Sequence, residues 1–149
     1  MNTIKQKQRQ QQRKLRVFLS YAAADGAYAH QLHHILSQRL NLQIFTDRAL
    51  SAGEDWKSKL KAELAQCDIF VVLLSPNSVQ SAWVLQELGA AWMLEKPILP
   101  VVTHPQVLNK IPVELSNVHL IEVKDLEYPE IINKIFDSVE AQATNGSFV

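Results

Sequence analysis

The chain has 149 residues, a length that one hydrophobic core stabilises without disulfides or metal ions, so we expect one domain. Its 15 basic and 15 acidic residues cancel, which argues against a general role at nucleic acids or membrane surfaces. The first sixteen residues nevertheless hold six of the basic residues and no acid. A basic, glutamine-rich leader at residues 1–14, expected to be disordered, therefore precedes an acidic domain at residues 15–142 and a tail at 143–149.

The sequence carries no targeting signal that we can identify. The leader lacks the apolar stretch of a secretory signal, and the chain has no run of about eighteen apolar residues that would span a membrane. We therefore expect a soluble, cytoplasmic protein with no membrane partner. The single cysteine, Cys67, lies among apolar residues and has no partner for an internal disulfide, so we expect a buried, unreactive side chain.

The first half of the chain alternates between strand and helix patterns. The apolar, β-forming run Leu15–Tyr21 predicts a strand, and apolar residues at helical spacing predict a helix over Asp25–Leu40. Leu42–Phe45 predicts a short strand, and Thr46–Gly53 predicts a polar loop.

A second helix and a central strand follow this loop. Ser51 and Glu54 have the spacing of a capping box, which predicts where the helix begins. The expected inward-facing stripe of the helix is Trp56, Leu60, Leu64 and Cys67. Ile69–Leu74 is apolar at every position, as is typical of a parallel strand that is covered on both faces.

The second half continues the alternation. We expect a helix over Ser81–Glu95 and a strand over Pro97–Val102, where Pro100 withholds a ladder hydrogen bond and predicts an early end or a bulge. The remaining expected elements are a loop with short helix at Thr103–Leu115, a last strand at Asn117–Val123 and a closing helix at Pro129–Val139.

Five strands that alternate with helices predict a flavodoxin-like, three-layer α/β fold. Parallel neighbours need right-handed helical crossovers, so the five-stranded sheet should be mainly parallel with helices on both faces. Ligands in such sheets bind beyond the carboxyl ends of the strands, near the switch in strand order. We therefore expect the loops after Tyr21, Phe45 and Leu74 to meet there, which makes Ser20, Tyr21 and Ala22 candidate substrate-binding residues.

Trp83 and Glu87 form a candidate ligand pair, because residues four apart on a helix have Cβ atoms about 5–6 Å from each other. Such a pair suits a ligand with a flat ring and a polar sugar. At about 100° per residue, the predicted core-facing sector is Val84, Leu85, Leu88, Ala91 and Trp92, and a separate stripe is Trp83, Glu87, Ala90 and Leu94. The alternative is that Trp83 covers the sheet edge and Glu87 is an ordinary solvated residue.

Several other classes of site lack their sequence signatures. The chain has only four glycines, which form neither GxGxxG nor a P-loop, so a tightly held dinucleotide cofactor is not expected. A phosphate-accepting receiver domain needs an aspartate where this chain has Leu74-Ser75-Pro76. His30 and His34 have helical spacing, but no cysteine or acid completes a metal site, so we expect a solvated helix face and no metal.

The chain resembles a Toll/interleukin-1 receptor (TIR) domain, most closely the bacterial type. Ordered matches cover residues 15 to about 140. The matching segments are Val17–Tyr21 with Asp25, Ile44–Asp47 leading through Gly53 to Trp56, Cys67–Pro76, Ser81–Trp83 with Glu87, and Lys96–Pro100. None is diagnostic alone, but together they indicate the fold.

The resemblance implies one of two activities, because TIR domains include self-assembling signalling adaptors and enzymes that cleave the nicotinamide–ribose bond of NAD+. The enzymatic members use a glutamate that matches Glu87, often with an aromatic residue at the position of Trp83. The loop that contains Asp47 and Arg48 takes part in assembly and active-site closure in the family. These two residues are thus candidates to contact substrate or a neighbouring subunit, with a plain surface loop as the alternative.

The chain departs from the family pattern at one place. Many relatives carry a basic residue just after the Ser-Tyr of the first strand, whereas this chain has Ala22, Ala23 and Ala24. Contacts to a substrate phosphate are then expected from backbone N–H groups, from Arg48 or from another chain.

These observations predict an NAD+ nucleosidase in which NAD+ is the substrate and no cofactor is needed. The products would be nicotinamide and ADP-ribose or a cyclic ADP-ribose, in bacterial antiphage defence, with a separate sensor or effector protein as partner. Two alternatives stay open at this point: a scaffold that pairs with other TIR domains without chemistry, and a nucleoside-processing enzyme of related architecture.

Overall fold

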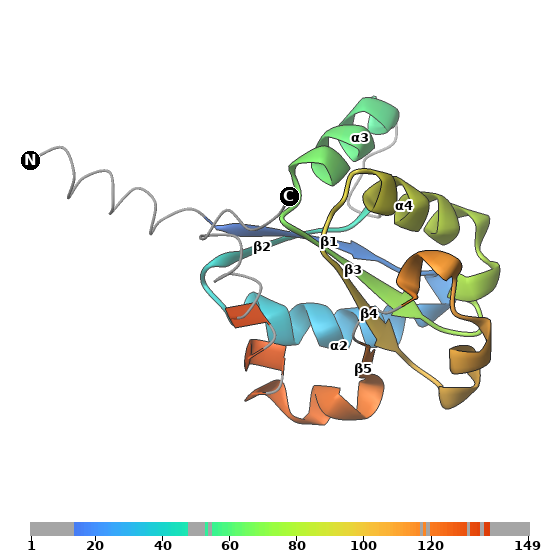
Figure 1. Ribbon diagram of the computed structural model, residues 1–149. Helices are drawn as coiled ribbons and strands as arrows, with labels where there is room; N and C mark the ends of the chain where they lie inside the picture. Colours follow the sequence, from blue (N-terminus) through green and yellow to red (C-terminus); the bar gives the residue numbers. More distant parts are fainter. Residues whose placement is uncertain are drawn as a thin grey trace, which may run out of the picture.

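Five strands form one sheet in the order β2-β1-β3-β4-β5 (Figure 1). The computed structural model describes residues 14–47, 53, 55–116, 118, 120–130, 132–134 and 136–137, so the leader up to residue 13 and the tail lie outside it. The strands are β1 (Leu15–Ser20), β2 (Leu42–Phe45), β3 (Ile69–Leu74), β4 (Ile98–Val102) and β5 (Ile121–Glu122). All four strand pairs are parallel, which confirms the predicted α/β class.

Helices cover both faces of the sheet (Figure 1). The α-helices are α2 (Gly26–Ser37) on one face and α3 (Trp56–Gln66) and α4 (Ala82–Met93) on the other. The 3-10 helices are η1 (Ala23–Asp25), η3 (Ser78–Gln80), η4 (Pro105–Lys110), η5 (Val113–Leu115) and η6 (Val123–Glu127). No helix within the described residues has both the length and the apolar character needed to cross a bilayer.

Two hydrophobic clusters lie on the two faces of β3, whose six residues are all buried. The cluster beside α2 includes Ile132 and Phe136. The described residues from 129 to 137 are helical, which agrees with the predicted closing helix. A strand buried on both faces is thus what the continuous apolar run of β3 indicated.

Pro100 lies inside β4 without ending it or causing a break in its register, contrary to the sequence prediction. The backbone N–H of Thr103 donates to the carbonyl of Leu74, so alternate residues of β4 direct their N–H groups toward β3. Pro100 belongs to the other set, whose nitrogens face β5. The ladder with β5 begins at Val101, so the missing N–H of Pro100 lies before the first paired residue.

The last strand is shorter than the predicted Asn117–Val123. It consists of Ile121 and Glu122, which pair with Val101 and Val102, and the chain then enters η6. Residues 118 and 120 are not part of the strand, and residues 117 and 119 lie outside the described residues.

Helix α3 begins at Trp56, so the predicted capping box does not mark its start, and Ser51 and Glu54 lie outside the described residues. Asp55 is the N-cap instead. Its carboxylate accepts from the backbone N–H of Ser58 at 3.4 Å and from the Ser58 hydroxyl at 2.8 Å, and these hydrogen bonds lower the pKa of Asp55.

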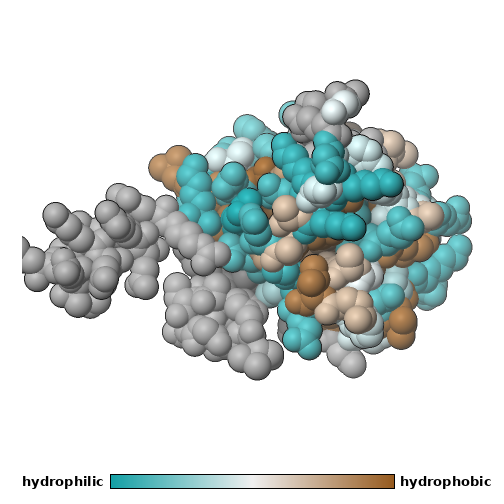
Figure 2. All heavy atoms as spheres, turned by 90° about the horizontal axis from the view of Figure 1, so that it is seen from above, coloured by the Kyte–Doolittle hydropathy of each residue, from teal (hydrophilic) through white to brown (hydrophobic). Residues whose placement is uncertain are grey.

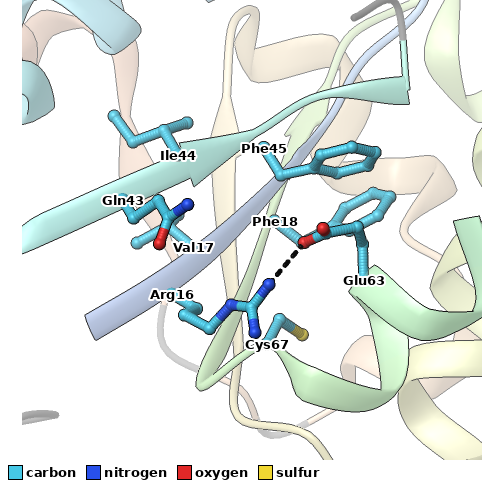
Figure 3. Close-up of a pocket in the computed structure, with 8 residues that line it drawn as sticks. All are labelled: Arg16, Val17, Phe18, Gln43, Ile44, Phe45, Glu63 and Cys67. Carbon is cyan, nitrogen blue, oxygen red and sulfur yellow. Dashed lines mark hydrogen bonds and ion pairs between the residues drawn. The ribbon is translucent and has the colours of Figure 1, made fainter. Parts of the chain in front are cut away.

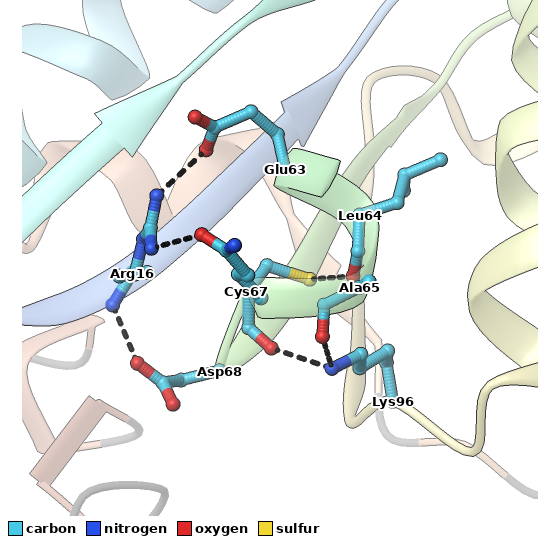
Figure 4. A network of polar contacts seen from close by, with 8 residues as sticks. Arg16, Glu63, Leu64, Ala65, Cys67, Asp68 and Lys96 are labelled. Carbon is cyan, nitrogen blue, oxygen red and sulfur yellow. Dashed lines mark hydrogen bonds and ion pairs between the residues drawn. The ribbon is translucent and has the colours of Figure 1, made fainter. Parts of the chain in front are cut away.

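A polar network joins β1 to α3 at the amino ends of the strands (Figure 4). The Arg16 guanidinium donates to Gln66 at 2.5 Å and to Glu63 at 3.2 Å, and the Arg16 backbone N–H donates to Asp68 at 2.8 Å. Lys96 donates to two carbonyls at the carboxyl end of α3, at 2.6 and 3.0 Å, and so satisfies acceptors that the helix leaves open. Structural polar contacts thus gather at the edge of the sheet opposite the expected ligand site.

The reactivity of the Cys67 thiol can be used to test the packing beneath α3. The side chain is buried, as predicted, and burial raises its pKa to about 11. Because the thiolate is the reactive form, the folded protein should react with an aromatic disulfide reagent at pH 8 about 100-fold more slowly than the urea-unfolded chain. Absorbance of the released thiolate measures both rates. Rates within threefold of each other would contradict this burial.

Candidate active site

The carboxylate of Glu87 lies in the core, directly against the end of β1. Glu87 is 3% exposed and Ser20 is fully buried, and the Ser20 hydroxyl donates to Glu87 Oε1 at 2.8 Å. Side chains alternate along a strand, so Ser20 points to the same face as Phe18, which packs in the α4-side cluster. A buried carboxylate destabilises a fold unless it is hydrogen-bonded, and Ser20 supplies one such bond.

The orientation of α4 corrects the sector that was predicted from the sequence. Its buried residues are Val84, Glu87, Leu88 and Ala91. Leu85 and Trp92, which were expected in the core, are 37% and 53% exposed. The hydrophobic pattern of the helix placed Glu87 outside the core, because that pattern takes no account of the Ser20 hydroxyl on β1. The buried face of α4 is therefore rotated from the predicted one so that it includes Glu87.

Trp83 lies at the surface one helical turn before Glu87, and two other elements hold it. Its indole N–H donates to Asp47, the second residue after β2. Its ring lies 5.7 Å from the Trp56 ring at an interplanar angle of 52°. Trp83 is 36% exposed and Trp56 is 41% exposed. Trp56 was expected to be structural, but neither indole belongs to a core cluster.

A third group of polar residues joins the loops after β1 and β3. Asp25 and Ser75 belong to the segments that match the family, but neither was predicted to have a role in the site. The Ser75 hydroxyl donates to the buried Asp25 carboxylate and accepts from the backbone N–H of Ser78 at 2.9 Å. In return, the Ser75 N–H donates to the Ser78 hydroxyl at 2.8 Å. The order Ser-Pro-Asn-Ser after a buried strand was the available signal, since such residues bind neighbouring backbone groups.

The structure brings together most, but not all, of the predicted site residues. Ala22 packs in the α4-side cluster, the side of the sheet on which Ser20 meets Glu87. Asp47 contacts α4 through Trp83. Tyr21 packs instead against the cluster beside α2, because it alternates with Ser20. Arg48 lies outside the described residues.

A small cavity lies beneath α3, away from these residues (Figure 3). It measures about 60 Å³. Its lining residues are Arg16, Val17, Phe18, Gln43, Ile44, Phe45, Glu63 and Cys67. That volume suits a few water molecules at about 10–15 Å³ each and is too small for a nucleotide. The cavity is therefore not the site that Glu87 and Trp83 define.

Comparison with known proteins identifies the family. A family model described as the TIR domain matches residues 17–135 of the chain. The chain belongs to the TIR family. The TIR domain of the Toll-related receptor TRR-2 from Hydra magnipapillata shares the fold, with a TM-score of 0.67 and 16% identity over 83% of this chain and 97% of that one.

Three further proteins are similar to this chain in sequence or in fold. It is 37% identical over 99 residues to the NAD(+) hydrolase ApTIR of an Actinoplanes species, a match that covers 58% of this chain and 14% of that protein. The TIR domains of the activated Roq1 resistosome align with a TM-score of 0.53 and 24% identity over 69% of this chain and 67% of that one. The CMP N-glycosidase BcmB of Clostridium botulinum aligns with a TM-score of 0.55 and 20% identity over 80% and 98%.

The hydrogen bond between Ser20 and Glu87 should be measurable in the stability of the domain. Removing the hydroxyl in Ser20→Ala takes a donor from a buried carboxylate, so the free energy of unfolding should fall by about 1–3 kcal/mol in urea titrations. Combining Ser20→Ala with Glu87→Gln should reveal a coupling of at least about 0.5 kcal/mol.

Ser37→Ala is the matched control, because Ser37 is exposed and donates to a carbonyl of its own helix at 2.9 Å. Its effect should stay within about 0.5 kcal/mol of the wild type. A Ser20→Ala protein as stable as the Ser37→Ala protein would show that the buried bond contributes nothing.

Proposed function

We propose that this TIR domain cleaves the bond between nicotinamide and ribose in NAD+, with Glu87 as the catalytic residue. The observation that carries the proposal is a carboxylate in the core, hydrogen-bonded by a strand hydroxyl, one helical turn from an exposed indole held by Asp47. A buried acid at the carboxyl end of a parallel sheet serves chemistry better than it serves stability. The relative named an NAD(+) hydrolase supports the substrate.

The chemistry requires one well-placed carboxylate. As the glycosidic bond breaks, its electron pair leaves with nicotinamide, which departs as a neutral amide and needs no proton. Positive charge develops on the ribose, and Glu87 stabilises that oxocarbenium-like state electrostatically and through the ribose hydroxyls. Addition of water to the anomeric carbon, with loss of a proton, gives ADP-ribose. Attack by an atom of the ADP-ribose itself gives a cyclic product.

The buried position of Glu87 sets a condition on this activity. With 3% exposure, its carboxylate reaches a ribose only when the residues that cover it move aside. The same burial strengthens its electrostatic effect once the substrate excludes water. Substrate and any activating partner must therefore favour an open arrangement over the closed one described here. Antiphage defence with a separate sensor protein, inside a bacterial cell, is the setting that we propose.

The decisive experiment compares nicotinamide release by the wild type and by Glu87→Gln. The amide keeps the volume and a hydrogen-bond acceptor but lacks the charge, so kcat should fall about 100- to 1,000-fold, as measured by chromatography of the products. Glu95→Gln, at an exposed glutamate just beyond the same helix, should keep the wild-type rate. Unchanged cleavage by Glu87→Gln would remove this residue from the mechanism. Free nucleosides, tested together with CMP, separate NAD+ cleavage from the nucleoside-processing alternative.

Exposed apolar residues on α4 favour a second candidate, a scaffold that acts by TIR–TIR association. Leu85 is 37% exposed, Trp92 53% and Met93 73%. If these side chains bind another copy, the double variant Trp92→Ser and Met93→Ser should lower the association constant in sedimentation velocity at least tenfold. Val113→Ser, at an 80% exposed residue outside α4, is the control. Association without any product from NAD+ at high protein concentration would favour the scaffold over the enzyme.

A further inference from the structure

The first turn of α3 places a tryptophan and a lysine side by side at the surface. The Lys57 ammonium lies 5.6 Å from the centroid of the Trp56 ring, and the same ring packs against Trp83. Both tryptophans are more than a third exposed, and neither contributes to the hydrophobic core. Two indoles that the core does not use, with a cation beside them, form a surface suited to an aromatic, anionic ligand.

The charge around this surface complements a diphosphate. The loop after β1 offers only Ala22, Ala23 and Ala24 where phosphate contacts were sought. Lys57 and Lys61 are exposed and share one face of α3. The exposed N-cap carboxylate of Asp55 lies near Lys61, which contributes to lowering its pKa, so Lys57 is the cation left for a ligand on this face. The nearby Asp47 carboxylate already accepts the Trp83 N–H. The face that carries α3 and α4 is largely hydrophilic, with separate hydrophobic areas (Figure 2).

We propose that Trp56 and Lys57 bind the adenosine diphosphate half of NAD+, with the adenine stacked on the indole and the diphosphate beside the ammonium. The inference rests on the proposed function. Trp83 lies between Trp56 and Glu87, so one dinucleotide could contact Trp56 with one half and Glu87 with the other. Trp83 then marks the junction: the nicotinamide riboside half lies toward Glu87, and the adenylate half lies toward α3. The ligand class is a nucleoside diphosphate, and the site supplies affinity while Glu87 supplies the chemistry.

Calorimetric titration of the full chain with ADP tests the site without any need for cleavage. Trp56→Ala should raise the dissociation constant for ADP about tenfold through the lost stacking. Lys57→Ala should raise it about fivefold at low salt, and the difference from wild type should shrink at 0.5 M salt because exposed charges are screened. The matched controls are Tyr128→Ala, at another exposed aromatic residue, and Lys59→Ala, at an exposed lysine on a different face of α3. Both controls should bind ADP like the wild type.

The outcomes separate this inference from the proposed function. ADP that binds the wild type, and binds Trp56→Ala and Lys57→Ala equally well, would overturn the inference, as would a wild type that binds no ADP. ADP binding that depends on both residues, in a protein that never releases nicotinamide, would support the site and reject the NAD+ cleavage. If cleavage occurs, Trp56→Ala should raise KM for NAD+ about tenfold at constant kcat and leave cleavage of nicotinamide mononucleotide, which lacks adenosine, unchanged.

Discussion

The hydrogen bond between Ser20 and Glu87 determines which residues of α4 face the sheet and which face solvent. Burying a carboxylate opposes folding by several kcal/mol unless donors compensate it, and a hydroxyl at the end of a central strand is a short, fixed donor. The bond sets the rotation of α4, since the glutamate must face the sheet. Leu85 and Trp92 then face outward although both are strongly apolar. A requirement at one polar atom thus determines which hydrophobic side chains the helix offers to solvent or to a partner.

Polar contacts hold the surrounding loops in a similar way. Asp25 and Ser75 join the loops that follow β1 and β3, the two strands on either side of the switch in strand order. Asp47 attaches the end of β2 to α4 through Trp83. All three loops begin at carboxyl ends of neighbouring parallel strands, so the sheet alone brings them close, and these side chains then fix their relative positions. In the proposed site, such contacts would hold the three loops in place before a ligand binds.

The sequence predicted the fold well because the parallel, doubly covered sheet leaves strong local patterns. The continuous apolar run of β3 and the helical spacing of α2 were read correctly for that reason. Tertiary contacts decided the rest. Glu87 was placed outside the core because amphipathic analysis ranks a glutamate as polar and does not see Ser20, which is 67 residues away. The sequence does not reveal the pairing of Trp56 with Trp83 either, since the two residues lie in the first turns of different helices.

If Glu87 acts as proposed, the magnitudes of the contacts indicate which of them would break first to expose it. The Ser20–Glu87 bond joins a core strand to a core-facing helical residue, so breaking it exposes a buried charge and is the costlier route. The contacts of Trp83 with Asp47 and Trp56 lie at the surface, where a hydrogen bond and an aromatic pair contribute about 0.5–1.5 kcal/mol each. Together they would hold Trp83 in its observed position by about 1–3 kcal/mol, a factor of about 5–150. A ligand that stacks on Trp56 competes with the Trp83 contact, so nucleotide binding would itself favour the open form and expose the glutamate to the ribose.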